Sequence, residues 1–143
     1  MRVLVTGGAG YIGSHATREL IVRGHEVCVL DNLSRGHKEA VDKKSKLFIG
    51  DVGDSQLVKD ILQNHQIDVV MHFAAYIEVA ESVLDPEKYY NNNYRNTLVL
   101  LKAMSDVGVK RLVFSSTAAV YGRPSQNPVN EMQARSPISP YGQ

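Results

Sequence analysis

The chain has 143 residues, of which 43% are hydrophobic and 22% are charged, and its formal net charge is +1. This composition is typical of a single globular domain, and it lacks the strongly basic balance that nucleic acids or anionic membranes attract. No apolar run approaches the roughly 20 residues that span a membrane, and the first residues lack a signal-peptide layout. Cys28 is the only cysteine, so we expect no internal disulfide and a cytoplasmic location.

The first half of the sequence alternates short apolar runs with helical patterns, as expected of buried parallel strands joined by helices. Asp54 is expected to cap the second helix, because its carboxylate can accept from the free N–H groups of the first turn. The predicted elements are a strand at Arg2–Thr6, a helix at Ile12–Arg23 with Ile12, Ala16, Leu20 and Ile21 on its inner face, a strand at Glu26–Leu30, a loop at Asn32–Lys46 with one helical turn, a strand at Lys46–Gly50 and a helix at Asp54–His65.

The second half continues the alternation and then becomes irregular. Three prolines follow Tyr121-Gly122, and Ser139-Pro140 is the pair expected at the start of a helix. The predicted elements are a strand at Asp68–Phe73, a short helix at Glu78–Leu84, a long helix at Glu87–Val107 with Tyr90, Tyr94, Leu98 and Leu101 facing inward, and a strand at Arg111–Ser115.

This order of elements predicts an α/β fold, a Rossmann-like doubly wound parallel sheet with helices on both faces. We expect the strand order 3-2-1-4-5, with a switch point between the first and fourth strands, and ligands bind at such points beyond the carboxyl ends of the strands. We interpret residues 1–143 as a single domain of this fold.

A glycine-rich turn follows the first strand, and it carries Gly7, Gly10 and Gly13. Gly7 permits the tight turn, Gly10 lets a pyrophosphate approach the backbone, and Gly13 lets the helix pack near the strand. The free N–H groups at the start of that helix favour an anion. Asp31 lies eighteen residues after Gly13 and ends the second strand, where a carboxylate can accept from a ribose diol. The pattern indicates a dinucleotide site.

Asp31 favours NAD over NADP, because a carboxylate accepts from a 2′-hydroxyl and repels a 2′-phosphate. Arg35 follows four residues later and is the side chain that could support NADP. We expect NAD, and tighter binding of NADP⁺ in a calorimetric titration would contradict that.

The chain resembles the extended short-chain dehydrogenase/reductases, and within them the UDP-glucose 4-epimerases. The resemblance rests on Thr6-Gly-Gly-Ala-Gly-Tyr-Ile-Gly13, Asp31-Asn32-Leu33, His72-Phe73-Ala74-Ala75, Tyr89-Tyr90-Asn91-Asn92-Asn93, Ser115-Ser116-Thr117-Ala-Ala-Val-Tyr121-Gly122 and Ser139-Pro140-Tyr141-Gly142. Nucleotide-sugar dehydratases carry Asp-Glu after the active-site threonine. Ala118-Ala119 stand there instead and cannot transfer protons, so hydride removal and return is the expected chemistry.

The resemblance implies that UDP-glucose and UDP-galactose interconvert through a 4-keto sugar with NAD as the cofactor. Tyr141 would be the catalytic base and Thr117 would bind the reacting hydroxyl. One departure concerns Ile77, which stands where the typical enzyme has a lysine. The implied cofactor residues are Gly7, Gly10, Tyr11, Ile12, Gly13, Asp31, Asn32, Leu33, Ser34, Arg35, Gly36, Asp51, Val52, Phe73, Ala74, Ala75, Ile77, Asn92 and Ser115.

The family motif Tyr-x-x-x-Lys would place a lysine two residues beyond Gln143. The resemblance therefore implies that residues 1–143 are an incomplete NAD-binding domain of a longer protein, without its substrate domain. We expect the chain to be inactive by itself, with an apolar patch left uncovered on one face of the sheet. The implied partners are a UDP-sugar and, in the longer protein, a second copy in a homodimer. Nucleic acid and membrane are not expected partners.

Other interpretations stay open from the residues alone. The chain could be a non-catalytic NAD-binding module, or part of a different nucleotide-sugar epimerase, a reductase or a decarboxylase. His72 is more simply a hydrogen-bonded structural histidine than a catalytic group, and the other histidines lack partners at metal-ligand spacing. We expect Asn91–Asn93 to form a buried polar cluster rather than a solvated helix face.

Overall fold

A computed structural model describes residues 1–143. Its five parallel strands form one sheet in the order β3-β2-β1-β4-β5, which confirms the predicted order. The first and fourth strands are adjacent, with Val3 beside Val69 and Thr6 beside His72. The switch point therefore lies where it was predicted. The strands are β1 (Arg2–Thr6), β2 (Glu26–Asp31), β3 (Lys46–Ile49), β4 (Val69–His72) and β5 (Leu112–Phe114).

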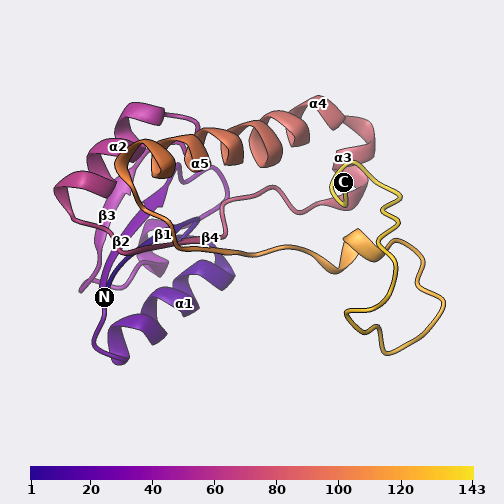
Figure 1. Ribbon diagram of the computed structural model, residues 1–143, viewed down its shortest axis with the longest axis horizontal. Helices are drawn as coiled ribbons and strands as arrows, with labels where there is room; N and C mark the ends of the chain where they lie inside the picture. Colours follow the sequence, from indigo (N-terminus) through magenta and orange to yellow (C-terminus); the bar gives the residue numbers. More distant parts are fainter.

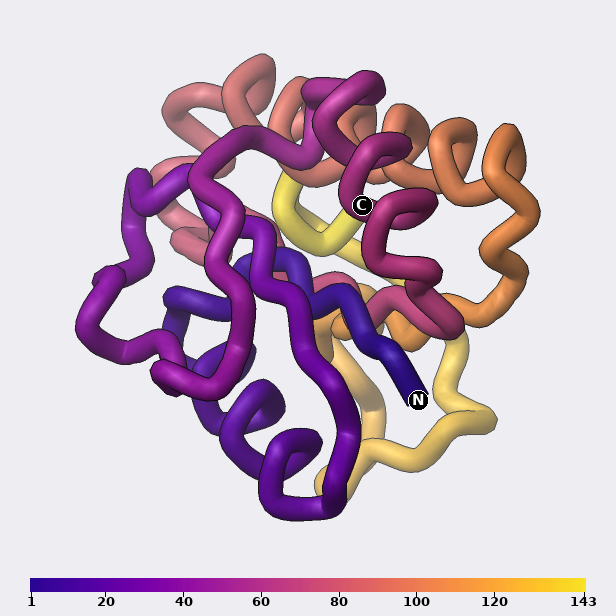
Figure 2. The backbone as a smooth tube through the Cα atoms, turned by 90° about the vertical axis from the view of Figure 1, so that its left-hand side faces the viewer, coloured from indigo at the N-terminus to yellow at the C-terminus, as the bar shows by residue number.

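Helices cover both faces of the sheet. Figure 1 shows α2 and α5 on one face and α1 on the other, and Figure 2 shows the same three layers after a quarter turn. No helix has the length and hydrophobicity that crossing a membrane requires. The helices are α1 (Tyr11–Val22), α2 (Ser55–Asn64), α3 (Val79–Leu84), α4 (Pro86–Tyr89) and α5 (Asn96–Val107), with a π-helix η2 (Tyr90–Arg95) and the 3-10 turns η1 (Lys38–Ala40) and η3 (Ala118–Tyr121).

Two apolar cores hold the layers together. The larger core lies between the sheet and helices α2 and α5, and it includes Leu4, Leu30, Ile61 and Leu100. The smaller core consists of valines from β1, β2 and β4, against which Leu20 and Ile21 of α1 pack. Alternate residues of β1 point to opposite faces of the sheet, which is why neighbouring apolar residues of one strand serve different cores.

Two of the predicted inner faces were partly wrong. In α1 the buried residues are Gly13 and Thr17, while Ile12 is 60% exposed. Gly13 must face inward, because a Cβ there would lie 2.2 Å from the carbonyl oxygen of Gly7. Ile12, one residue earlier on the helix, therefore turns outward.

The long helical stretch also presents a different face from the one predicted. Its buried residues are Tyr89, Leu100, Ala103 and Met104. The residues expected to face inward are at least 40% exposed, and they are Tyr90, Tyr94, Leu98 and Leu101. The π-helix η2 lies between α4 and α5, and each of its turns holds more residues than an α-helical turn. Residues of α5 therefore lie on a different side of the helix from the one that α-helical spacing counted from α4 predicts.

The chain after β5 extends away from the sheet and returns toward α3 and α4 (Figure 1). Val113 and Phe114 of β5 are 49% and 53% exposed, so this edge of the sheet is only half covered. Ser139 is buried, and its hydroxyl and carbonyl accept hydrogen bonds from Gly142 and Gln143. These hydrogen bonds form a turn at residues 139–142, and the structure assigns no helix there, so the helix start expected at Ser139-Pro140 stays a prediction.

Candidate functional site

An open cleft lies at the carboxyl ends of β1, β2 and β3. Gly7 and Gly10 of the glycine-rich turn form one side of it, and the loop after β4 forms another. Gly7 has φ +73°, a conformation that favours glycine, and a Cβ there would lie 2.6 Å from the backbone nitrogen of Ala74. The two loops therefore meet closely only because this residue is glycine.

The start of α1 provides a place for an anion. Gly10 occupies the N-cap position without a side-chain hydrogen bond to the first turn, and no acidic residue lies in that turn. The first N–H groups of a helix lack partners within the helix and carry a partial positive charge. Because Gly10 also lines the cleft, a phosphate can approach this backbone closely.

Asp31 is the acidic group of the cleft, and it is only 8% exposed. One carboxylate oxygen accepts a hydrogen bond from the backbone N–H of Ala9 at 2.9 Å, and the other accepts from that of Leu33 at 2.8 Å. Leu33 adopts φ 58° to make this turn. A carboxylate has about four lone-pair directions, so Asp31 retains acceptor capacity for a ligand hydroxyl.

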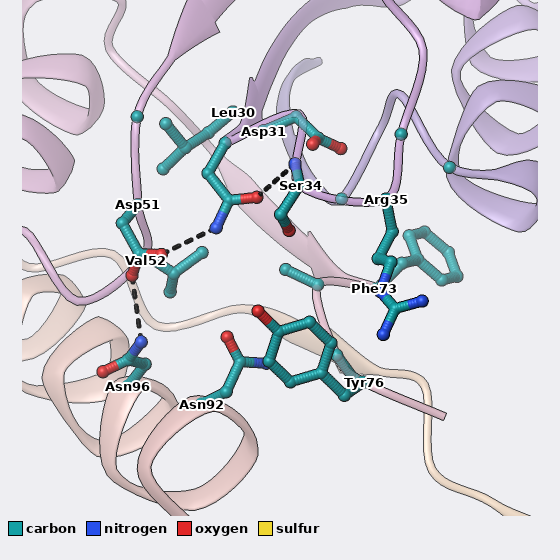
Figure 3. A pocket seen from close by; sticks show the side chains of 17 residues that line it. Leu30, Asp31, Ser34, Arg35, Asp51, Val52, Phe73, Tyr76, Asn92 and Asn96 are labelled. Carbon is teal, nitrogen blue, oxygen red and sulfur yellow. Dashed lines mark hydrogen bonds between the residues drawn. The ribbon is translucent and has the colours of Figure 1, made fainter. Parts of the chain in front are cut away.

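Asp51 is fixed by two asparagines at the far side of the cleft. It accepts from the side-chain amides of Asn32 at 2.8 Å and Asn96 at 2.9 Å (Figure 3). The backbone N–H of Gly53 donates to it as well, at 2.7 Å. Asp51 therefore joins the loop after β2, the loop after β3 and the start of α5 into one wall.

A second cleft lies beside the first, between β5, the η2–α5 stretch and the segment that contains Tyr141. Thr117 and Tyr141 both line it. The hydroxyl oxygen of Thr117 accepts from the N–H of Ala119 at 3.1 Å, which leaves its O–H free to donate. The N–H of Tyr141 donates to the hydroxyl of Ser82 at 3.3 Å, and the Tyr141 ring meets Tyr89 edge to face.

The segment Phe73–Ala75 lines both clefts and forms the boundary between them. Asn93 of η2 holds the next residue, Tyr76, by both backbone groups: its carbonyl accepts from the Tyr76 N–H at 2.9 Å, and its amide donates to the Tyr76 carbonyl at 2.8 Å. The π-helix thus positions the boundary. Such π-segments occur frequently at functional sites.

His72 lies under this boundary and is 4% exposed. Its Nδ1 is 2.6 Å from the Thr6 hydroxyl, and its Nε2 is 3.0 Å from the Thr97 hydroxyl. Thr97 donates its proton to the carbonyl of Asn93, so Nε2 must carry the ring proton and Nδ1 must accept from Thr6. Burial lowers the pKa of His72 from 6.5 to about 4. These hydrogen bonds confirm the structural interpretation of His72.

Comparison with known proteins agrees with this arrangement. Residues 3–143 match the sequence profile of the NAD dependent epimerase/dehydratase family. The chain belongs to that family. A UDP-glucose 4-epimerase from Lactobacillus helveticus is 56% identical over 143 residues, which are 100% of this chain and 43% of that protein. A probable UDP-arabinose 4-epimerase from Oryza sativa subsp. japonica is 47% identical over 149 residues, which cover 98% of this chain and 37% of that protein.

The solved structures show the same similarity in three dimensions. The structure of UDP-glucose 4-epimerase from Brucella ovis in complex with NAD has a TM-score of 0.96 and is 43% identical to this chain. The match covers 99% of this chain and 43% of the Brucella ovis chain. The chain therefore spans less than half the length of these relatives. The resemblance noted in the sequence and the predicted fold are both confirmed.

The first cleft of this epimerase/dehydratase family member gathers most of the cofactor residues predicted from the sequence. The predicted residues that line it are Gly7, Gly10, Asp31, Asn32, Ser34, Arg35, Gly36, Asp51, Val52, Phe73, Ala74, Ala75 and Asn92. The sequence prediction omitted Leu30, Gly50, Tyr76 and Asn96, which line it too. Tyr76 and Asn96 come from distant segments, and no local pattern singles them out.

The remaining predicted cofactor residues lie elsewhere. Tyr11, Ile12 and Ile77 are 83%, 60% and 63% exposed and do not line the first cleft. Gly13 packs against Gly7, Leu33 turns its backbone toward Asp31, and Ser115 lines the second cleft. The expected buried polar cluster is correct in part: Asn92 and Asn93 are half-buried and hydrogen-bonded to each other, whereas Asn91 is exposed.

Proposed function

We propose that this chain is the cofactor-binding part of an NAD-dependent nucleotide-sugar 4-epimerase that interconverts UDP-glucose and UDP-galactose. The observation that carries the proposal is the pair of adjoining clefts. Asp31 and the glycine-rich turn line the first, Thr117 and Tyr141 line the second, and Phe73–Ala75 belong to both. A dinucleotide that crosses this boundary would have its adenosine in one cleft and its nicotinamide in the other.

The residues present suit such a cofactor. Gly10 leaves room for a pyrophosphate at the start of α1, and Asp31 has acceptor capacity for a ribose diol. Bound NAD⁺ would supply the hydride acceptor, and the same hydride would return to the sugar. Asn92 and the backbone of Phe73–Ala75 would fix the cofactor at the boundary between the clefts.

Tyr141 and Thr117 would act on the 4-hydroxyl of the sugar. The Thr117 hydroxyl would donate a hydrogen bond to the sugar oxygen, since its own oxygen is already occupied by Ala119. The Tyr141 phenolate would take the hydroxyl proton as the C4 hydride leaves, and would return it when the hydride adds to the opposite face. Two contacts fix the position of Tyr141: the Ser82 hydroxyl accepts a hydrogen bond from its backbone N–H, and Tyr89 contacts its ring.

The test is product analysis with the gene product that contains this chain. With NAD⁺ and UDP-glucose, the expected product is UDP-galactose, with no net formation of NADH. Tyr141→Phe should abolish conversion while NAD⁺ binding persists. A product that has lost water or carbon dioxide, or stoichiometric NADH, would contradict epimerisation. UDP-xylose and UDP-arabinose serve as a second substrate pair, because one relative carries the name of a UDP-arabinose 4-epimerase.

A homodimer of the protein that contains this chain is also part of the proposal. Tyr94, Leu98 and Leu101 are exposed apolar side chains of the η2–α5 stretch that also line the outer wall of the second cleft, and contiguous exposed apolar side chains are typical of interaction sites. Light scattering should give twice the monomer mass, and Leu98→Lys should reduce it. A cytoplasmic location remains a proposal that rests on the single, free thiol of Cys28.

A further inference from the structure

An ion pair connects the loop after β2 to helix α3, next to the first cleft. The Nη2 atom of Arg35 lies 3.3 Å and 3.4 Å from the two carboxylate oxygens of Glu81. Arg35 lines the cleft, and Figure 3 shows its guanidinium turned toward Tyr76 at the cleft margin. The guanidinium carbon lies 5.7 Å from the centre of the Tyr76 ring, within cation–π range. Arg35 is thereby directed toward α3.

Glu81 is itself held in place from the other side. Its carboxylate accepts from the Lys88 ammonium at 2.6 Å and from the Tyr89 hydroxyl at 2.8 Å. Tyr89 is 1% exposed, and its hydroxyl oxygen accepts from the backbone N–H of Glu78. Lys88 and Tyr89, in that order of effect, hold the pKa of Glu81 below its usual range. The carboxylate that Arg35 meets is therefore fixed and ionised.

The ion pair between Arg35 and Glu81 bears on whether the cleft prefers NAD or NADP. An arginine that follows the second strand is the side chain that accommodates the 2′-phosphate of NADP in this type of fold, and arginine binds phosphate strongly through two parallel hydrogen bonds. Arg35 is in the right loop for that role. In this structure the Arg35 guanidinium instead forms an ion pair with Glu81. Asp31 presents a carboxylate to the same cleft.

We propose that Glu81 is a specificity-determining residue, which holds the Arg35 guanidinium against α3 so that it does not bind a 2′-phosphate. The preference for NAD then has two sources. Asp31 repels the phosphate directly, and Glu81 occupies the cation that would otherwise attract it. This inference rests on the proposed function, because it requires that the cleft binds the adenosine half of a dinucleotide.

The experiment compares the dissociation constants of NAD⁺ and NADP⁺ by calorimetry in the wild-type protein and in Glu81→Gln. Glutamine removes the charge that attracts Arg35 and keeps one oxygen, which can accept from either Lys88 or Tyr89, since these two groups bind different oxygens of the carboxylate. We expect the ratio of the NADP⁺ constant to the NAD⁺ constant to fall about three- to fivefold, the size expected for one exposed ion pair. The ratio is measured within each variant, so a general weakening of binding cancels.

Two further variants identify the cause. Glu78→Gln removes a neighbouring acid that forms no ion pair with Arg35, and it should leave the ratio unchanged. In the double variant Glu81→Gln with Arg35→Gln, the gain for NADP⁺ should disappear. Three results would overturn this inference and leave the proposed function standing. They are an unchanged ratio in Glu81→Gln, an equal fall of the ratio in Glu78→Gln, and a gain for NADP⁺ that persists in the double variant without Arg35. If the wild-type protein bound neither nucleotide, the proposed function would fail and this inference with it.

Discussion

The carboxylate of Asp31, at the end of β2, accepts a hydrogen bond from the backbone N–H of Ala9 at 2.9 Å. Ala9 belongs to the glycine-rich turn that follows β1, so this contact joins the carboxyl ends of two adjacent strands, in addition to the backbone hydrogen bond from Gly7 to Leu30. Both residues are buried. The acid that is predicted to recognise the ribose therefore also determines the position of the turn that is predicted to bind the pyrophosphate.

Asp31→Asn should impair both stability and cofactor binding. The asparagine amide would face either the Ala9 or the Leu33 N–H, and a buried donor left without a partner costs about 1–3 kcal/mol. We expect a loss of that size in the free energy of unfolding by urea, and at least about a tenfold weaker affinity for NAD⁺, which corresponds to 1.4 kcal/mol. The matched control is Asp54→Asn, because asparagine is as good a helix N-cap as aspartate. Equal NAD⁺ affinities in the two variants would contradict the assigned role.

His72 should make stability depend on pH in the acid range. Its pKa is about 4 in the folded protein against 6.5 unperturbed, so below pH 6.5 the unfolded chain binds a proton that the folded protein does not. The free energy of unfolding should therefore fall between pH 6.5 and about 4, by at most about 3.4 kcal/mol from this group.

Urea denaturation at several pH values between 7.5 and 4.5 measures this slope in wild-type protein and in His72→Gln. The variant should show a shallower slope over that range, because no imidazole remains to be protonated on unfolding. His37→Gln, at an exposed position, should keep the wild-type slope. The assignment is wrong if His72→Gln and the wild-type protein lose stability in parallel.

Asn93→Ala should loosen the boundary between the two clefts. It removes both hydrogen bonds that hold the backbone of Tyr76, at an expected cost of about 1–3 kcal/mol in unfolding free energy. NAD⁺ binding should weaken as well, since Phe73–Ala75 precede the released residue. Asn91→Ala, at an exposed position two residues away, should change stability by less than about 0.5 kcal/mol. Similar losses in both variants would refute the anchoring role.

Gly13→Ala tests the close packing of α1 under the glycine-rich turn. The new Cβ would lie 2.2 Å from the Gly7 carbonyl oxygen, so the turn must shift, at a cost of about 1–3 kcal/mol. NAD⁺ affinity should fall with it. Gly24→Ala is the control, because that residue has φ +79° but nothing within 4 Å of an added Cβ. It should cost about 1–2 kcal/mol through backbone strain alone and leave NAD⁺ affinity unchanged.

The sheet and its order were predictable because their determinants are local. Each strand is a short apolar run, and the three glycines and Asp31 stand at a spacing that the fold requires. Asp54 caps α2 by accepting from the N–H groups of Gln56 and Leu57, as its position predicted. The inner face of α5 was not predictable in this way. Leu98, Leu100 and Leu101 surround the helix with apolar side chains, so periodicity does not select one face.

The walls of the first cleft were predictable only where a motif marks them. Asn96 binds Asp51 from 45 positions further along the chain, and Glu81 meets Arg35 across 46. Nothing in the local sequence of either pair indicates the contact, because it depends on how the loops after β2, β3 and β4 are brought together by the sheet. Such contacts become visible only when the fold is known.

The most direct test of the central claim is a titration of the ¹⁵N-labelled protein with NAD⁺, followed by the shifts of its backbone amide signals. The proposed site predicts saturable changes that are largest at Ala9, Gly10, Asp31, Val52 and Ala74, which lie at the carboxyl ends of the strands. The Val107–Arg111 segment precedes β5 at the opposite edge of the sheet and should not respond. No saturable change, or changes centred on that opposite edge, would contradict the account.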